Sequence, residues 1–498
     1  MADVFGNLGS EWRRRPLATD ILICLFMSLP LFLTAQIPLV DLPNHLAHQY
    51  IFRDWSTSVW LQKYYFVTPQ VTPNLGLELF VFVARRMMSI DAAVRLFCII
   101  TLWLLFWGTK FVSRELNAGS RLYRVVPLLA WGGPFQFGFL NYCFGVGLAL
   151  LFFGAYLRIR DRKIISLCLL LWPFCLVLLF CHLAAFGLAG LAVAAFELAR
   201  SYDPAAPKLS SYASEVMRRA LRAALIFIPP FLVFSVFDTP GHPSFGLHFA
   251  TFHQKIEGIL SITMFSSPLF EIALLVIALS GLLAALLSGA VRIRPETVTI
   301  AVTMAAIYLV LPRAAMGNGF IDYRIPWGAS FFVLATLAPD ARETLARRLL
   351  AVLFGLLSIA RVALIAVLWI SWEPSLAEIV AGLRSLPMGA RLTAVVGDQN
   401  SVALSRSPPL AHVAAYAVAY RQAFWSGMFA NFPGQLLHFQ PGYRMAWFSD
   451  LPTKLDRLDA RTDFVLVMHP RLIEISKELP LRVVVKGKDY EILAVTRH

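Results

Sequence analysis

The sequence predicts an α-helical polytopic membrane protein, with about eleven membrane-spanning helices and a small C-terminal α/β domain outside the cytoplasm. Two observations carry this prediction. Of the 498 residues, 58% are hydrophobic and only 15% are charged, whereas about 25% of residues are charged in soluble globular chains. The net charge of +14 comes from Lys and Arg clusters between long apolar runs. Such clusters set membrane topology and differ from the basic stripe that binds nucleic acid.

The first apolar run covers residues 17–37 and follows Arg13, Arg14 and Arg15. It is longer than the core of a signal peptide and lacks a small-residue cleavage site, so we expect it to remain as the first span. Further runs of near-spanning length follow it along the chain. They begin near Val94, Leu122, Leu140, Ile164, Ala184, Ala220, Leu269, Thr297, Ile325 and Leu349. Several of these runs are short, and the segments over 122–157 can be counted differently.

The charged loops predict the orientation of these spans. With a cytoplasmic N-terminus every second loop is basic, as the positive-inside rule requires. This alternation of basic loops requires that residues 73–88, which carry Glu78, do not span the membrane. They would instead lie along its outer face as an interfacial helix. The C-terminal domain is then periplasmic, and the protein is expected in a bacterial inner membrane. The basic loops contain Lys110, Arg114, Arg121 and Arg124; Arg158, Arg160, Arg162 and Lys163; Arg218, Arg219 and Arg222; Arg292 and Arg294; and Arg342, Arg347 and Arg348.

The chain is predicted to divide near residue 372. Residues 1–372 form the transmembrane domain, with a first outer loop at residues 38–91, and residues 373–498 form the soluble domain. In that domain the sequence predicts buried strands at 391–396 and 463–468, a hairpin of 481–485 with 490–495, and helices at 410–420 and 470–479. His412, His438 and His469 are scattered along it, and we interpret them as ordinary surface or core histidines.

Polar side chains at the outer membrane face are the candidates for chemistry, because burying charge there is costly without a purpose. Asp41 precedes Pro43 at the expected start of a helix, on which His45 and His48 share one face with Asp41. Asp41 is interpreted either as a helix-start residue or as a general base; His45 is a further catalytic candidate, and His48 is a substrate-binding candidate. Asp41 and His45 are also candidate ligands of a divalent cation, although two histidines on one helix turn rarely suffice.

A second group of candidates lies farther along the outer face. Glu78 either pairs with a neighbouring arginine, Arg85 or Arg86, or faces the cleft beside Asp41. Because the guanidinium fork suits phosphate, Arg313 and Arg324 are candidates to hold a lipid phosphate. Asp322 would orient one of these two arginines; the alternative is an interfacial Asp–Arg pair. His182 is a weaker substrate-binding candidate of the same kind.

These features resemble the GT-C glycosyltransferase superfamily. The resemblance rests on a cytoplasmic N-terminus, an acidic residue just after the first span, interfacial helices before the second span and an extracytoplasmic C-terminal domain. It implies that Asp41 is the first-loop catalytic acid and that Glu78 is the second acidic residue found in some members. The acidic pair usual in the family is replaced here by Asp41-Leu42-Pro43-Asn44.

The resemblance implies an inverting glycosyltransferase that moves a sugar from a polyprenyl-phosphate donor to a glycan, lipid or protein acceptor. No nucleotide-binding motif is present in the sequence, which agrees with a donor whose bond is already activated. A secondary transporter or lipid flippase is the first alternative and should show repeated halves or broken helices. A polysaccharide polymerase or ligase and a non-catalytic scaffold are the other two. The sequence assigns no cofactor, and leaves the sugar, the acceptor and the use of a metal open.

Overall fold

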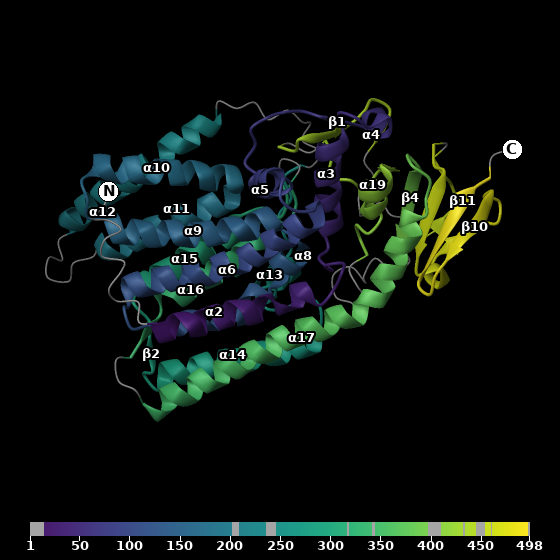
Figure 1. The fold of residues 1–498 in the computed structure, drawn as a ribbon. Coiled ribbons are helices and arrows are strands. Elements are labelled where there is room, and N and C mark those ends of the chain that lie inside the picture. Colours follow the sequence, from purple (N-terminus) through teal and green to yellow (C-terminus); the bar gives the residue numbers. More distant parts are fainter. Residues whose placement is uncertain are drawn as a thin grey trace.

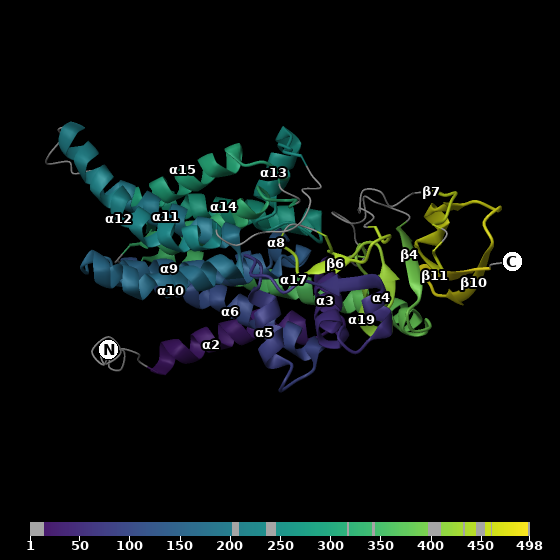
Figure 2. The ribbon, with the colours of Figure 1, turned by 90° about the horizontal axis from the view of Figure 1, so that it is seen from above.

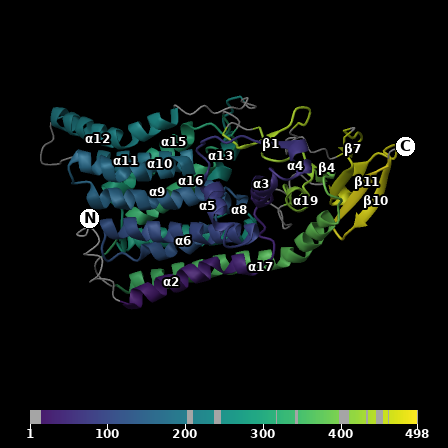
Figure 3. The ribbon, with the colours of Figure 1, turned by 45° about the horizontal axis from the view of Figure 1, so that its top comes forward.

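The structure, a computed structural model, describes residues 14–201, 209–235, 246–315, 318–340, 344–396, 410–431, 434–444, 454–459 and 461–496. Arg13 and Arg342, two of the arginines used to predict topology, lie outside these ranges. Long helices run roughly side by side, and a small sheet lies at one end of the elongated molecule (Figure 1). Figures 2 and 3 show the same arrangement from two other directions.

The bundle consists of helices that are apolar over most of their length. A helix of about 20 residues spans 30 Å, the thickness of a bilayer's hydrocarbon core. Six described helices are long and apolar enough to cross a membrane: α6 (Ile90–Leu116), α9 (Leu140–Ile159), α10 (Ile164–Cys181), α11 (Leu183–Ser201), α14 (Pro268–Leu287) and α17 (Leu345–Arg384). The others at predicted runs are α2 (Arg14–Ser28), α12 (Leu209–Ser235), α15 (Pro295–Val310) and α16 (Arg324–Thr336).

The run that begins at Leu122 departs from the prediction of one long helix. It forms a 3₁₀ turn (Leu122–Val125) followed by two short helices, α7 (Val126–Ala130) and α8 (Gly133–Phe137). Each short helix carries a proline in its first turn, where the missing N–H costs nothing but the preceding helix must end. Broken helices at membrane depth are tolerated when protein surrounds them, and α7 and α8 are almost entirely buried.

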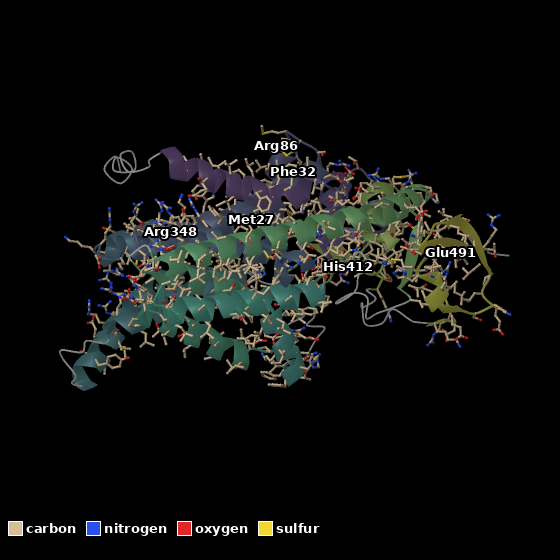
Figure 4. All side chains as sticks on the ribbon, turned by 90° about the horizontal axis from the view of Figure 1, so that it is seen from below. Met27, Phe32, Arg86, Arg348, His412 and Glu491 are labelled. Atoms are coloured by element: carbon tan, nitrogen blue, oxygen red, sulfur yellow. The ribbon has the colours of Figure 1, made fainter. Side chains whose placement is uncertain are left out.

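The helices connect at two opposite ends of the bundle. At one end, β2 (Val291–Arg292) pairs with β3 (Ala338–Pro339) between neighbouring helices. Figure 4 places Arg348 at this end, where nitrogen-tipped side chains gather, and places His412 and Glu491 at the other. The described basic loops therefore lie together, away from the sheet.

The interior of the bundle contains an ion pair between two helices that are far apart in the sequence but packed together. Arg361, in α17, and Glu271, in α14, are both fully buried and bonded to each other, and Arg361 also donates to the carbonyl oxygen of Trp131 at 2.6 Å. The second carboxylate oxygen of Glu271 accepts backbone N–H groups from Phe265 and Ser267. Because both charges are hydrogen-bonded, removing one partner would leave the other uncompensated.

The end opposite the basic loops carries several short elements. Between α2 and α6 the chain forms α3 (Leu42–Asp54), α4 (Val59–Tyr64), β1 (Tyr65–Val67) and α5 (Gly76–Ala84). Helix α13 (Phe252–Leu260) lies at the same end. With nine residues, α5 is about 13 Å long and cannot cross a bilayer. Its exposed side chains include the apolar residues Leu79, Phe82 and Val83, as expected of an interfacial helix.

The C-terminal strands form a five-stranded sheet of order β10-β11-β8-β4-β5. The strands are β4 (Arg391–Val396), β5 (Phe424–Trp425), β8 (Phe464–Met468), β10 (Leu481–Lys486) and β11 (Tyr490–Val495). The predicted strands and the hairpin are thus confirmed. β4 pairs in parallel with β5 and β8, whereas β11 pairs antiparallel with β8 and β10. Helix α17 continues beyond residue 372 as far as Arg384 and leads into β4.

One predicted helix in this domain is wrong and another is shorter than expected. Residues 470–479 form a 3₁₀ turn (Pro470–Leu472) and then β9 (Glu474–Ile475), which pairs with β7 (Lys454–Leu455). His469, just before the turn, has a left-handed φ of 52°, and Ile473 is buried against Leu455. Ile473 has an extended backbone, and the pairing of β9 with β7 holds this segment extended beside the buried cluster. Of the helix predicted at 410–420, only the second half is helical: α19 covers Ala415–Arg421.

The residues after α17 are interlocked with the first outer loop. Strand β6 (Leu437–Phe439) pairs antiparallel with β1, and α19 packs against α3. Side-chain bonds reinforce this contact: Ser58 donates to Gln422 at 2.6 Å, and Tyr65 donates to the carbonyl oxygen of Ala423 at 3.2 Å. The two parts therefore share one core, and residues near 410–440 contribute to the surroundings of Asp41.

Candidate active site

Asp41 lies at the start of α3 but does not cap it. Its backbone N–H donates to the carbonyl oxygen of Phe137 at 2.9 Å, and its side chain makes no capping hydrogen bond in the described structure. The residue is only 6% exposed. Its carboxylate oxygen Oδ1 lies 3.4 Å from Nε2 of His412, a residue of the C-terminal domain. A nearly buried carboxylate that does not serve the helix terminus is available for chemistry.

The turn between α8 and α9 comes unusually close to Asp41. Gly138 has a φ of +93°, which L side chains rarely adopt. A Cβ atom at Gly138 would lie 3.0 Å from the nitrogen of Asp41 and 3.1 Å from its Cβ atom. Only glycine therefore allows this backbone to pack directly beside the carboxylate.

The two histidines on α3 face different surroundings. Nε2 of His45 lies 3.2 Å from the carbonyl oxygen of Gly138; since a carbonyl only accepts, the proton must be on Nε2. Burial lowers the pKa of His45, so the ring is neutral. His48 is 2% exposed and packs edge-on against Phe52, and burial lowers its pKa to about 3. His45 thus borders the turn beside Asp41, whereas His48 lies in the core.

Glu78 points toward α9 and not toward its neighbouring arginines. Nδ2 of Asn141 donates to Oε2 of Glu78 at 3.1 Å, and Asn141 Oδ1 accepts the N–H of Leu77 at 2.6 Å. Arg85 and Arg86 instead lie over the ring of Phe82. Burial raises the pKa of Glu78 to about 7, although the Asn141 hydrogen bond opposes this shift. This carboxyl group therefore holds a proton through most of the acidic range.

This raised pKa predicts a pH dependence of stability. An unfolded Glu78 loses its proton near its ordinary value of 4.5, but the folded protein keeps it to about 7. Rising pH between these values therefore favours the unfolded state, by at most about 3 kcal/mol in total. We expect the unfolding temperature of the wild type to fall across this window more steeply than that of Glu78→Gln. Parallel curves in a thermal scan at several pH values would contradict the assignment.

Arg324, at the start of α16, is the cation of the site. Its guanidinium carbon lies 4.3 Å from the centre of the Phe139 ring, and within the described residues it forms no ion pair. Its Nε is buried and has no hydrogen-bond acceptor among the described residues. Asp41 is close enough for its charge to stabilise the guanidinium. Such a fork, partly buried and not committed to a carboxylate, is suited to an anionic ligand.

His182 lies close enough to Arg324 to feel its charge. Burial lowers the pKa of His182 well below its ordinary value, and the positive charge of Arg324 lowers it further. The ring of His182 contacts the edge of Tyr142, with 5.3 Å between centroids, and Tyr142 donates to the backbone oxygen of Arg324 at 2.6 Å. Because Tyr142 follows Asn141, the first turn of α9 joins the surroundings of Arg324 to those of Glu78.

Arg313 and Asp322 belong to a separate charge cluster. Asp322 is fully buried and lies 2.8 Å from Nζ of Lys255 and 3.5 Å from Nη1 of Arg313. Arg313 also approaches Glu257 at 4.0 Å and stacks over Phe320 at 4.5 Å. Asp322 thus orients Arg313 and not Arg324, and two carboxylates offset the charges of the two cations in this cluster. Phe320 in turn packs 6.2 Å from Phe139, so aromatic rings separate Arg313 from Arg324.

The structure therefore brings part of the predicted set together. Asp41, His45, Arg324 and His182 surround one region, and Glu78 reaches it through α9. His48 faces the core, and Arg313 with Asp322 lies beyond the aromatic rings. Among the described residues no group of three or more His, Cys, Asp or Glu side chains could hold a metal ion. Sequence reasoning did not identify Gly138, Phe139 or Asn141 as parts of this site, although an asparagine at the end of an apolar run is a signal of such a role.

Comparison with solved structures shows the same fold elsewhere. ArnT from Cupriavidus metallidurans matches in its undecaprenyl-phosphate-bound and apo crystal structures, with TM-scores of 0.53 and 0.52 and sequence identities of 12% and 11%. Each match covers 96% of this chain and 98% of the other. The predicted GT-C fold is thereby confirmed, although such low identity shows the fold alone.

A weaker likeness is to the arabinofuranosyltransferase AftD from Mycobacteria, in its R1389S mutant. It is 14% identical and covers 98% of this chain but 42% of that one, with a TM-score of 0.46, which is too low to support an argument. No family model and no curated protein matches the sequence.

Proposed function

We propose that this chain, which has the GT-C fold, is an integral membrane glycosyltransferase. It would transfer a sugar from a polyprenyl-phosphate donor to an extracytoplasmic acceptor with inversion. The proposal is carried by the proximity of two groups: a nearly buried carboxylate at Asp41 and, close enough to feel its charge, a partly buried Arg324 guanidinium that forms no ion pair among the described residues. The undecaprenyl phosphate in the ArnT structure supports the choice of lipid carrier.

The chemistry follows from the two groups. The acceptor hydroxyl gives its proton to Asp41 while its oxygen attacks the anomeric carbon. The bond from that carbon to the phosphate oxygen breaks, and the electron pair leaves with the polyprenyl phosphate. Arg324 stabilises the charge that develops on the leaving phosphate. One displacement of this kind inverts the anomeric centre.

The remaining residues receive supporting roles in this proposal. The end of the bundle with Arg348 is cytoplasmic, by the positive-inside rule, which puts the site and the C-terminal domain outside a bacterial inner membrane. Glu78, with its pKa near 7, and His182 would hydrogen-bond the sugar, and His45 would fix the turn at Gly138. Arg313 with Asp322, and His48, would shape the surrounding walls.

A lipid flippase is the runner-up, because the broken stretch of α7 and α8 is a feature of transporters. The two functions differ in what happens to the donor. We would reconstitute the protein in vesicles with polyprenyl-phosphate sugars and envelope lipids as acceptors, and follow the lipids by mass spectrometry. Transfer predicts that polyprenyl phosphate and a glycosylated product appear in equal amounts. Movement of an intact donor across the membrane, without cleavage, would support the flippase instead.

The close approach of Gly138 to Asp41 predicts the effect of a methyl group. In Gly138→Ala, the positive φ costs about 1–2 kcal/mol of stability, and the new Cβ atom displaces Asp41, so turnover should fall sharply. Gly289→Ala is the matched control: its φ is also positive, at 70°, but nothing described lies within 4 Å of the new atom. It should lose similar stability and keep full turnover. Equal turnover in the two variants would contradict the role of this turn.

A further inference from the structure

A histidine of the C-terminal domain reaches the proposed base. His412 lies 371 residues after Asp41 in the sequence, yet Nε2 of its ring is 3.4 Å from Oδ1 of Asp41. The two side chains are only 11% and 8% exposed. Figure 4 shows His412 at the junction between the helical bundle and the C-terminal sheet. The contact therefore joins two parts of the chain inside the protein.

The surroundings of His412 hold its ring in place. Its ring meets Phe429 edge-on at 4.9 Å and Trp425 at 6.0 Å between centroids. The segment that carries these aromatic residues is bonded to α3 through Asn44, which accepts the N–H of Phe429 at 3.2 Å and donates to the carbonyl oxygen of Gly427 at 3.3 Å. Because Asn44 is three residues after Asp41, its two hydrogen bonds hold the segment packed around His412 beside the turn of α3 that carries Asp41.

We propose that His412 is a positioning residue for Asp41, so that the C-terminal domain completes the site. This inference rests on the proposed function. The imidazole holds Oδ1 and leaves Oδ2 to receive the proton of the acceptor hydroxyl. The carboxylate needs such a partner, since it makes no capping bond to its own helix. Among the described residues, Arg324 and the neutral His45 are the other groups shown to feel the charge of this carboxylate.

The first test compares turnover in His412→Ala and His412→Gln. A misplaced base lowers kcat by up to about 100-fold, while the KM for the donor stays within twofold because the phosphate site is intact. The glutamine variant should recover part of the loss, since its amide can still donate to Asp41. The matched control is His438→Ala, whose buried ring stacks on Phe66 at 5.0 Å in the same domain. It should keep its kcat.

Two kinetic results would speak against a positioning role of His412. A kcat for His412→Ala within twofold of the wild type would overturn the proposal, as would an equal loss in His438→Ala. A second measurement does not depend on turnover: the unfolding temperatures of His412→Ala, Asp41→Ala and the double variant, because alanine removes the contact from either side. Coupled side chains give shifts that do not add, and additive shifts would overturn the contact. If the wild type transfers no sugar from any donor, the proposed function fails while this cycle still decides the contact.

Discussion

Replacing Asp41 by Asn should abolish sugar transfer while the protein folds normally. Asparagine keeps the size of the side chain but cannot take a proton from the acceptor hydroxyl, and general-base catalysis contributes about 10²- to 10⁴-fold. The loss should appear in kcat, with little change in the KM for the donor. Steady-state kinetics in vesicles with a polyprenyl-phosphate sugar would measure both constants.

The control for this experiment is Asp91→Asn. Asp91 is another carboxylate of the same outer region, but it accepts hydrogen bonds from Tyr50 at 2.6 Å and Tyr420 at 2.9 Å and serves the packing of the domain. Its variant should lose some stability and retain its kcat. Full activity of purified Asp41→Asn would remove Asp41 as the base, whatever the control shows.

Replacing Arg324 by Ala should mainly weaken the use of the donor. The guanidinium is the cation of the site that forms no ion pair with a described carboxylate, so its loss leaves the lipid phosphate without that partner. Loss of one such electrostatic partner costs about 10²- to 10³-fold, seen here in kcat/KM for the donor. Lysine should restore part of this, because it keeps the charge but not the fork.

A general loss of positive charge is controlled by Arg53→Ala. Arg53 lies in the first outer loop, with a side chain 46% exposed and paired with Asp54. Its removal changes the net charge equally but should leave donor kinetics unchanged. If Arg324→Ala shows the donor dependence of the wild type, Arg324 is not part of the phosphate site.

The sequence was sufficient for the parts that depend on local patterns. Long apolar runs located most of the helices of the bundle, short apolar runs located β4 and β8, and two segments flanking residues 486–489 located the β10–β11 hairpin. It failed where prolines divided an apolar run into α7 and α8, since hydrophobicity alone does not show a break. It also failed at 470–479, where one buried isoleucine favours an extended segment.

In the candidate site, too, some residues follow from local sequence patterns and others only from the fold. Asp41, Glu78 and Arg324 were proposed from the sequence because burying charge at a membrane face is costly without a purpose. Asp322 was assigned to either arginine, and only the fold shows that Lys255 and Arg313 surround it. His412 was set aside as a scattered histidine, because nothing in the sequence indicates that residues 371 positions apart meet. Contacts between distant segments depend on packing, which no local pattern records.

In the proposed mechanism Asp41 and Arg324 serve one site in different ways, and a measurement of lipid binding separates their roles. Binding of undecaprenyl phosphate would be measured for the wild type, Asp41→Asn and Arg324→Ala in the same vesicles. We expect Asp41→Asn to bind the lipid at least as tightly as the wild type, because a negative charge beside the phosphate is gone, while Arg324→Ala binds at least about tenfold more weakly. Weak binding by Asp41→Asn together with unchanged binding by Arg324→Ala would contradict the assignment of Arg324 to the phosphate and of Asp41 to the acceptor hydroxyl.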